Sequence, residues 1–265
     1  MKFCRFEFNG SPEYGLIESV AGGDSITQLL LSAPHEASDR KNLPARGIAP
    51  ISFHEAKVLA PVQPSKIVCV GRNYRQHAAE LGNEIPQEPL LFLKPPSSLL
   101  GPGETILRPK ISQRTDFEGE LGIVIGKRCH KLAPHEDVRA YILGYTVVND
   151  FTARDLQKKD PQWTRGKGYD TFCPVGPLVT DEIDPWKGVT VETRVNGEVR
   201  QHGNTRDFIF PIDVIIRYAA EFMTLMPGDL IPTGTPEGVG PVVAGDVIEV
   251  SVEGIGTLKN PVADE

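Results

Sequence analysis

The sequence predicts a β-rich α+β fold in which a mixed sheet folds into a sandwich or roll. Its 26 glycines and 23 prolines divide the 265 residues into short segments. Many of these segments are apolar, β-branched and bounded by turn residues, as strands usually are. Patterns with helical spacing are few. We therefore expect strands to form the core and helices to cover it.

The expected elements can be placed along the chain. The segment FCRFEFNGSPEYGLIES, which starts at Phe3, has the form of a hairpin. Apolar runs between turn residues predict strands at residues 66–70, 121–125, 142–148 and 247–252. Helical patterns occur at residues 72–81, in a short turn after Asp150, and at residues 211–223. The last of these begins with a proline, which suits the first turn of a helix.

Two domains are predicted, a small N-terminal β domain at residues 1–62 and a larger catalytic domain at residues 63–265. After its hairpin, the N-terminal segment is rich in turn residues and lacks clustered catalytic residue types. The stretch APVQPSK then places two prolines ahead of a strong strand, which indicates a linker.

Composition excludes several classes of protein. A net charge of -7 and a pI near 5.5 argue against a nucleic-acid partner, because phosphate binding needs a cationic surface. No segment reaches the roughly 20 apolar residues of a membrane span, and the N-terminus lacks a signal-peptide core. We expect a cytoplasmic protein. The four cysteines are scattered, without zinc-binding or disulfide spacing, and are expected to be reduced thiols.

Acidic residues cluster in the segment RTDFEGELGIVIG, where Asp116, Glu118 and Glu120 alternate ahead of an apolar run. Residues two apart on a strand share a face, so Glu118 and Glu120 can converge on one ion if the strand twists or bulges. The alternative is an exposed strand face, but the apolar run that follows indicates a strand entering the core, where carboxylates need compensation. We expect Asp116 to be a solvated or hydrogen-bonded neighbour.

A third metal ligand is suggested at the end of the next predicted strand. In LGYTVVNDFTARDLQ, Asp150 follows an apolar run, at a place where sheets present functional groups to a cleft. By itself Asp150 would be interpreted as a helix cap, but together with the two glutamates it is interpreted as a ligand. An all-oxygen ligand set favours Mg²⁺, Mn²⁺ or Ca²⁺ over Zn²⁺.

Six ordered blocks resemble the fumarylacetoacetate hydrolase family: VGRNYRQHAAE, LFLKPPSS, DFEGELGIVIGKR, GYTVVNDFTARDLQ, KGYDTFCPVGP and MPGDLIPTGTPEGVG. The resemblance extends from about residue 66 to 261 and implies the mixed β-sandwich roll of that family's C-terminal domain. It also implies that Glu118, Glu120 and Asp150 bind Mg²⁺ or Mn²⁺, with Ca²⁺ as a further possible occupant. Lys167 matches the lysine beside the metal and would stabilise a developing enolate.

The resemblance also implies a catalytic pair, His77 and Glu80. They are three residues apart, so on a helix they share a face and can hydrogen-bond. Glu80 would then orient His77, which acts as general base or acid through water. An exposed helical pair without a role is the alternative.

Further positions match substrate contacts in the family. Arg154 and Gln157, one turn apart, are predicted to contact the substrate acid, since a guanidinium suits a carboxylate. Gly234 and Thr235 match a loop whose backbone and hydroxyl hold the same acid; a plain tight turn is the alternative. Lys94 is a weaker candidate, and we leave it out of the predicted site.

One departure affects the expected activity. Val70 occupies the place, seven residues before His77, where the longer hydrolases of the family carry a fourth carboxylate ligand. The chain is therefore more similar to the bacterial isomerases, decarboxylases and acylpyruvate hydrolases.

We expect an enzyme that acts on a small 2-oxo or 2-hydroxy-enol (di)carboxylate through a metal-stabilised enolate, by isomerisation or decarboxylation, as in aromatic-acid degradation. Hydrolytic cleavage of a C–C bond in an acylpyruvate is the close alternative, and a non-catalytic metal- or ligand-binding homologue is the alternative from another class. The resemblance also implies a homodimer.

Overall fold

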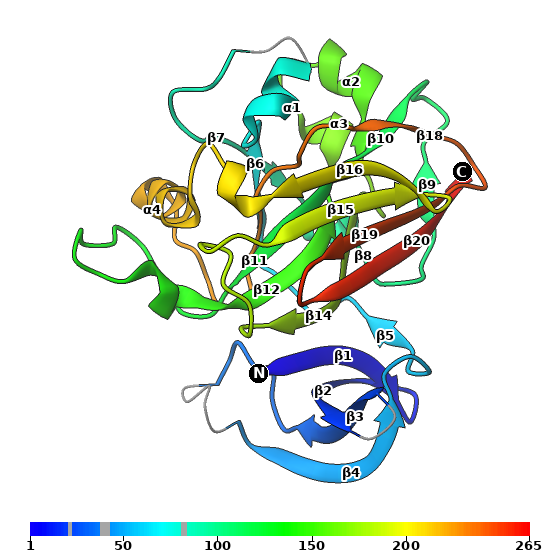
Figure 1. Ribbon diagram of the computed structural model, residues 1–265, viewed down its shortest axis with the longest axis vertical. Coiled ribbons are helices and arrows are strands. Elements are labelled where there is room, and N and C mark those ends of the chain that lie inside the picture. Colours follow the sequence, from blue (N-terminus) through cyan, green and yellow to red (C-terminus); the bar gives the residue numbers. More distant parts are fainter. Residues whose placement is uncertain (21–22, 38–42, 81–83) are drawn as a thin grey trace.

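The computed structural model describes residues 1–20, 23–37, 43–80 and 84–265, and arranges them mainly as strands in three sheets (Figure 1). This confirms the predicted β-rich α+β class. The largest sheet has twelve strands. Its order is β4 (Ala45–Ser52), β3 (Gly23–Leu30), β2 (Ser11–Val20), β1 (Lys2–Phe8), β14 (Cys173–Thr180), β12 (Ile142–Asn149), β11 (Gly119–Ile125), β17 (Leu230–Pro232), β6 (Ile67–Gly71) and β7 (Leu90–Lys94), with β5 (Val58–Leu59) on β1 and β8 (Leu99–Leu100) on β14.

Two smaller sheets complete the β structure. The five-stranded sheet has the order β16 (Glu198–Asn204), β15 (Thr190–Val195), β19 (Val247–Val252), β20 (Gly256–Asp264) and β9 (Ile106–Arg108). The three-stranded sheet has the order β13 (Thr152–Ala153), β10 (Thr115–Phe117) and β18 (Gly240–Val242). The sheets are mixed, because β6 is parallel to β17 and β9 is parallel to β20, whereas most other neighbours are antiparallel.

The sandwich is built from strands with two kinds of pattern. In β15 and β19 buried residues alternate with partly exposed ones, so each strand turns one face to the core and one outward. Their inner faces contact β11, whose seven residues GELGIVI are all buried. A continuous apolar run is expected for a strand covered on both sides. The centre of the molecule is therefore the layer between β11 and the five-stranded sheet.

The N-terminal hairpin is confirmed: β1 pairs with β2 across a turn at Asn9 and Gly10, both with positive φ. The segment that follows is rich in turn residues but also contains two further strands, β3 and β4, for which no prediction was made. Strands β1 to β4 form the lower lobe in Figure 1, and β1 pairs with β14, so the lobe continues the large sheet. A domain boundary near residue 62 stays a prediction.

Four α-helices and three 3₁₀ segments cover the sheets in the described residues. They are α1 (Arg75–Glu80), α2 (Arg154–Lys159), α3 (Thr164–Lys167), α4 (Ile212–Phe222), η1 (Pro96–Ser98), η2 (Val138–Tyr141) and η3 (Thr205–Asp207). In α4 the buried residues recur at intervals of three and four behind the capping Pro211, as the pattern predicts.

Helix α1 begins three residues later than predicted. Arg72 has a φ of 56°, outside the right-handed helical region, so no helix can pass through it. The side chain of Asn73 forms hydrogen bonds with the backbone of Phe210 and Thr233. The backbone carbonyl of Asn73 accepts a hydrogen bond from the N–H of Ile209. The predicted end at Leu81 lies outside the described residues.

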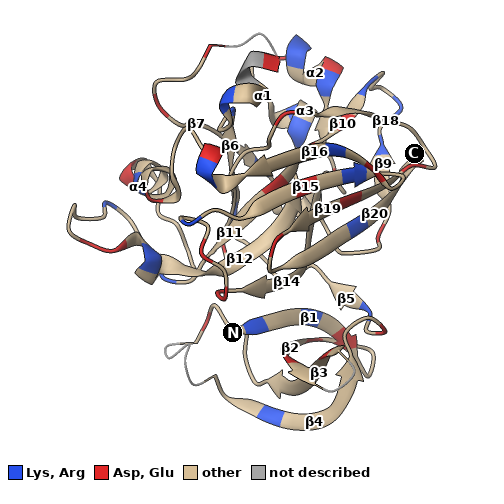
Figure 2. Ribbon diagram, viewed as in Figure 1, with Lys and Arg blue, Asp and Glu red and all other residues tan. Residues whose placement is uncertain are grey.

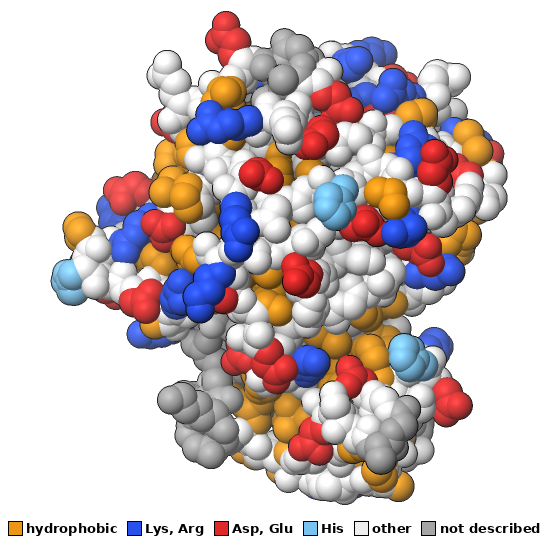
Figure 3. Space-filling view, viewed as in Figure 1, with side chains coloured by type: hydrophobic (Ala, Val, Ile, Leu, Met, Phe, Trp, Pro, Cys, Tyr) orange, Lys and Arg blue, Asp and Glu red, His pale blue; other side chains and the backbone are white. Residues whose placement is uncertain are grey.

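Charged side chains are interspersed along the ribbon and over the face shown in Figure 3, without a broad basic area on that face (Figures 2 and 3). Hydrophobic side chains gather at the waist between the N-terminal lobe and the rest of the molecule (Figure 3). In the described part of the chain, no helix is both long and apolar enough to span a bilayer.

Candidate active site

The sequence suggested that the acidic segment is one continuous strand, and the structure shows that it is not. It breaks at Glu118, with β10 on one side in the three-stranded sheet and β11 on the other in the large sheet. The side chains of Asn149 and Gln201 accept the N–H groups of Glu118 and Gly119, each at 2.9 Å, in place of a regular strand partner. Asp116, on β10, does not belong to the group of carboxylates that the two glutamates form with Asp150.

Close packing of the two layers fixes this break. A Cβ on Gly119 would lie 2.1 Å from Thr193 Oγ1 and 2.9 Å from Val250 Cγ1, both in the five-stranded sheet. Glycine is therefore the residue that lets the sheets meet between Glu118 and Glu120. At the same point the N–H of Asp150 donates to the carbonyl of Glu118 at 2.8 Å, which brings the end of β12 alongside.

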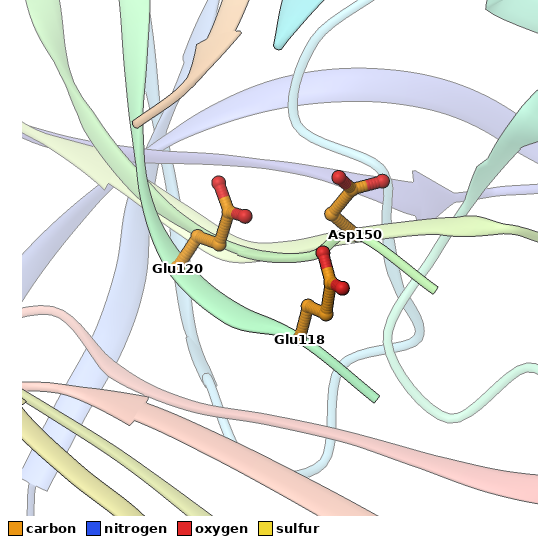
Figure 4. A group of neighbouring side chains, drawn as sticks. All are labelled: Glu118, Glu120 and Asp150. Carbon is orange, nitrogen blue, oxygen red and sulfur yellow. The ribbon is translucent and has the colours of Figure 1, made fainter. Parts of the chain in front are cut away.

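The three predicted metal ligands meet at this break. Each of Glu118, Glu120 and Asp150 offers a carboxylate oxygen, and these oxygens lie within 4.8 Å of one another (Figure 4). All three residues are buried. The structure therefore brings the sequence-predicted carboxylates together where two neighbouring strands of the large sheet meet: Glu118 precedes β11, Glu120 lies on it, and Asp150 follows β12.

Buried cations surround the carboxylates. Lys167 Nζ, from the end of α3, donates to Glu118 Oε2 at 2.7 Å and to Asp150 Oδ2 at 2.5 Å. Lys94 Nζ, from the end of β7, donates to Asp150 Oδ1 at 2.5 Å and to the carbonyl of Phe151 at 3.1 Å. We call Glu118, Glu120, Asp150, Lys94 and Lys167 the floor of the site.

Lys94 was considered in the sequence and left out, and the structure places it in direct contact with a predicted ligand. Its signal was a single lysine that ends the apolar run LLFL, although in the structure that run is only partly buried and Lys94 is the buried residue of β7. A buried ammonium needs a buried partner. That partner could not be identified from the sequence, because Asp150 lies 56 positions away.

The floor carries more negative than positive charge. Burial would raise the pKa of Glu118, but Lys167 and Arg154 outweigh it and hold that pKa well below its usual range. For Glu120, burial raises the pKa well above its usual value, Asp150 and Glu118 raise it further, and Lys167 only partly opposes them. Glu120 is thus the carboxylate whose negative charge is least compensated by protein groups.

Asp116 is fully buried and hydrogen-bonded, not solvated. Its carboxylate accepts from Arg114 Nε at 2.8 Å and from Arg154 Nε at 2.9 Å. Arg154 also donates to Glu118 Oε1 at 2.6 Å and to Gln157 Oε1 at 2.7 Å. The predicted substrate contacts Arg154 and Gln157 therefore lie in the site but are already bonded to each other and to two carboxylates.

Gly234 and Thr235 also have protein partners. The N–H of Gly234 donates to Glu120 Oε2 at 2.7 Å, and its φ of 99° favours glycine at this position. The hydroxyl of Thr235 donates to the carbonyl of Gly119 at 2.9 Å and accepts from Gln201. Both residues support the floor, and their contact with a substrate stays a prediction.

His77 and Glu80 lie on α1, above the floor. His77 Nδ1 is 3.4 Å from Glu80 Oε2, as their spacing predicts, and Glu80 also accepts the N–H of Gly238 at 3.1 Å. Burial lowers the pKa of His77 below its usual value, although Glu118 and Glu80 oppose this shift. Burial therefore disfavours the charged form of this imidazole.

One cavity of about 240 Å³ connects these groups. Its lining includes the three carboxylates, Lys167, His77, Arg154, Gln157 and Thr235. Apolar walls come from Val70, Phe92 and Trp163, so the position of the family's fourth carboxylate supplies a hydrophobic surface here. Two further lining residues are Arg72, which is half-buried, and Lys158, which is exposed; we call them the mouth of the cavity, and neither was a predicted site residue.

Comparisons with known proteins agree with this geometry. Residues 66–263 match the family model described as Fumarylacetoacetate (FAA) hydrolase C-terminal. The oxaloacetate tautomerase YisK of Bacillus subtilis is 41% identical over 261 residues, which cover 93% of this chain and 86% of that protein. The 2,4-didehydro-3-deoxy-L-rhamnonate hydrolase of a Sphingomonas species is 39% identical over 276 residues, which cover 100% of this chain and 96% of that protein.

A solved structure shares the fold over the full length. It is the 5-carboxymethyl-2-hydroxymuconate delta-isomerase from Mycobacterium smegmatis, with a TM-score of 0.89, 39% identity and coverage of 100% of both chains. The predicted β-sandwich roll is therefore confirmed as the fold of these proteins. This chain belongs to the fumarylacetoacetate hydrolase family.

Proposed function

We propose that this protein is a divalent-metal-dependent enzyme that isomerises a small 2-oxo or 2-hydroxy-enol acid by moving a proton at the carbon next to the 2-oxo group. The convergence of Glu118, Glu120 and Asp150 in one cavity with the buried His77 is the observation that carries this proposal. Relatives named as a tautomerase and an isomerase support it.

The floor fits a divalent cation. Three carboxylate oxygens within 4.8 Å form the hard, all-oxygen set that Mg²⁺ and Mn²⁺ prefer, and Ca²⁺ also accepts such ligands. The floor has two lysines against three carboxylates, and burial, together with Asp150 and Glu118, raises the pKa of Glu120. A cation held there would act as a Lewis acid on the 2-oxo group of a bound acid.

The chain's own residues supply the other parts of the reaction. In the tautomer whose Nδ1–H faces Glu80, His77 Nε2 is the basic nitrogen and can take a proton from the substrate or return one. Lys167 keeps its positive charge, because Asp150 and Glu118 raise its pKa against the opposing effect of burial. Its fixed ammonium stabilises the negative charge of an enolate as the proton leaves.

The cavity limits the size of the substrate. About 240 Å³ lies below the range of pockets that take drug-sized ligands. Val70, Phe92 and Trp163 give the carbon chain of such an acid an apolar surface to pack against. A compact acid of a few carbons is the substrate class that these dimensions favour.

Hydrolytic C–C cleavage is the second candidate. A relative that aligns with the whole chain is named as a hydrolase, and His77 could activate water in place of a substrate carbon. Decarboxylation of a 2-oxo diacid would use the same enolate-stabilising groups. The three reactions differ in the product that forms and in whether water is consumed.

The test is a panel of 2-oxo and acylpyruvate acids, assayed with Mg²⁺ and with Mn²⁺ and followed by product identity. Exchange of solvent deuterium into the carbon next to the 2-oxo group should occur on at least one compact acid and should need the metal. Release of CO₂ or a cleaved acid as the main product would favour decarboxylation or hydrolysis. Metal-loaded protein without turnover or exchange on any acid would contradict the enzyme proposal.

A homodimer is proposed from the family resemblance. Light scattering at micromolar concentration tests it, and a mass near the 29.0 kDa of one chain would contradict it.

A further inference from the structure

A short loop at residues 234–238, which we call the bridging loop, connects two parts of the site. The N–H of Gly234, at its start, donates to Glu120 Oε2 at 2.7 Å. The N–H of Gly238, at its end, donates to Glu80 Oε1 at 3.1 Å. Both glycines have a positive φ, 99° and 93°. One loop therefore hydrogen-bonds a predicted metal ligand at one end and the predicted acid–base pair at the other.

Gln201 fixes the middle of this loop. Its side-chain Nε2 donates to Thr235 Oγ1 at 2.7 Å and to the carbonyl of Pro236 at 2.8 Å. Its Oε1 accepts the N–H of Gly119 at 2.9 Å, and the Thr235 hydroxyl donates to the carbonyl of the same glycine at 2.9 Å. Gly119, the residue between the two glutamates of the floor, is thus held at both its N–H and its carbonyl. Gln201 is 1% exposed, so water cannot readily replace these partners.

The strand that carries Gln201 gives it a rigid base. Strand β16 pairs with β15 in the five-stranded sheet. The next residue on β16, His202, is on the opposite face of the strand and is exposed. The bridging loop lies directly against this strand, since a Cβ on Gly238 would be 1.9 Å from the carbonyl oxygen of Arg200. The sheet therefore supports the loop, and the Gln201 side chain joins the two.

We propose that Gln201 is a positioning residue that fixes the metal ligands and the acid–base pair relative to each other through the bridging loop. Gln201 does not line the cavity, so it acts through the loop and Gly119. Loss of its amide removes the acceptor of the Gly119 N–H and two donors to the loop. The inference rests on the proposed function, because it takes Glu118, Glu120 and Asp150 as metal ligands.

The test uses the whole chain and three measurements: Mn²⁺ affinity by calorimetry, hydrogen exchange of backbone amides by NMR at saturating Mg²⁺, and unfolding by denaturant. Gln201→Met keeps an unbranched side chain without the amide. Thr235→Val keeps the shape of the side chain without the hydroxyl, and Thr235→Ser keeps the hydroxyl. His202→Gln, which changes the exposed neighbour on the same strand, is the matched control.

The expected result is that Gln201→Met and Thr235→Val each raise the Kd for Mn²⁺ about 10–100-fold, as is usual when a partner of a metal ligand is lost. In Gln201→Met the amides of Gly234 and Gly238 should lose about tenfold in protection from exchange, while the amides in the middle of β19 keep theirs. Thr235→Ser and His202→Gln should stay close to the wild-type protein in both measurements.

Two outcomes would overturn the proposal. One is unchanged Mn²⁺ affinity in Gln201→Met. The other is an equal loss of protection at Gly234, Gly238 and throughout the strands, together with a lower free energy of unfolding, which would make Gln201 a residue of the fold alone. If Gln201→Met does not fold, equal Mn²⁺ affinity of Thr235→Val and Thr235→Ser would overturn it instead.

The wild-type protein separates this proposal from the proposed function. Absence of Mn²⁺ binding to the wild-type protein would reject both. Mn²⁺ binding that is the same in the wild-type protein and in Gln201→Met would reject the positioning role and leave the proposed function standing.

Discussion

At the floor of the cavity, Glu118 and Asp150 are each bonded to two cations, and every lysine there has a carboxylate partner. At the mouth, Arg72 and Lys158 have no such partner in the described residues. The charged side chains of the floor therefore position one another, with three carboxylates against two lysines. At the mouth, the charges have no protein partner among the described residues.

This contrast separates two tasks. Groups that must not move are buried and bonded on several sides, since a buried charge without a partner is costly. Groups that exchange ligands stay nearer to solvent, where an unpaired charge costs little. His77 lies between the two regions: it is buried, but its partner Glu80 also contacts Gly238 nearer to the surface.

The largest effect is expected when the floor loses a ligand. Glu118→Ala should abolish turnover because it lowers the affinity for the metal. It also leaves Lys167 and Arg154 without one of their carboxylate partners. Calorimetry with Mn²⁺ measures the loss of affinity. The wild-type protein in excess EDTA should behave in the same way and recover with Mg²⁺ or Mn²⁺. Full activity in EDTA, with no metal detectable, would show that the carboxylates have another role.

A large effect of a different kind is expected from His77→Ala. Metal affinity should stay nearly intact while turnover falls about 10²–10⁴-fold, the usual contribution of general acid–base catalysis. Glu80→Ala should add little in the His77→Ala background, because the two residues act as one unit. Hydrolysis should suffer more than decarboxylation, in which loss of CO₂ needs no base. Wild-type turnover in His77→Ala on every accepted substrate would make the pair structural.

Lys94→Met should test whether the floor depends on its charge pairs for stability. The substitution keeps an unbranched side chain but leaves Asp150 with one cation fewer, and breaking a buried pair costs about 3–5 kcal/mol. Chemical denaturation of the metal-free protein measures the loss, and added Mg²⁺ should recover part of it. A metal-free variant as stable as the wild type would show that this pair is not needed.

The smallest effect, of opposite sign, is expected at the mouth. Arg72→Gly removes a side chain from a left-handed backbone position that glycine adopts freely, so the folded protein should gain about 1 kcal/mol. For a chain of this size this corresponds to a rise in Tm of about 2–4 °C. Calorimetry checks it. A fall in Tm would mean that the Arg72 side chain supports the fold as well as the mouth.

The sequence by itself determined the fold class, the main strands, the amphipathic helix α4 and the residues of the acidic cluster. These follow from local patterns: β-branched runs between turn residues, apolar spacing of three and four, and carboxylates next to an apolar run. The resemblance to the family, carried by the six sequence blocks, predicted that Glu118, Glu120 and Asp150 belong to one site. The resemblance also singles out His77 and Glu80, and helical spacing predicts that they can hydrogen-bond.

Only the tertiary structure decided how these residues are used. The break at Glu118 depends on Asn149, Gln201 and Thr193, which reach it from other strands. The start of α1 depends on bonds from Asn73 to residues more than 130 positions away. Lys94 is paired with Asp150, whereas Arg72 and Lys158 have no carboxylate partner in the part of the chain that the structure describes. The reason is the same in both cases. Whether a charged side chain is paired depends on which distant segments the fold brings beside it, and local sequence does not contain that information.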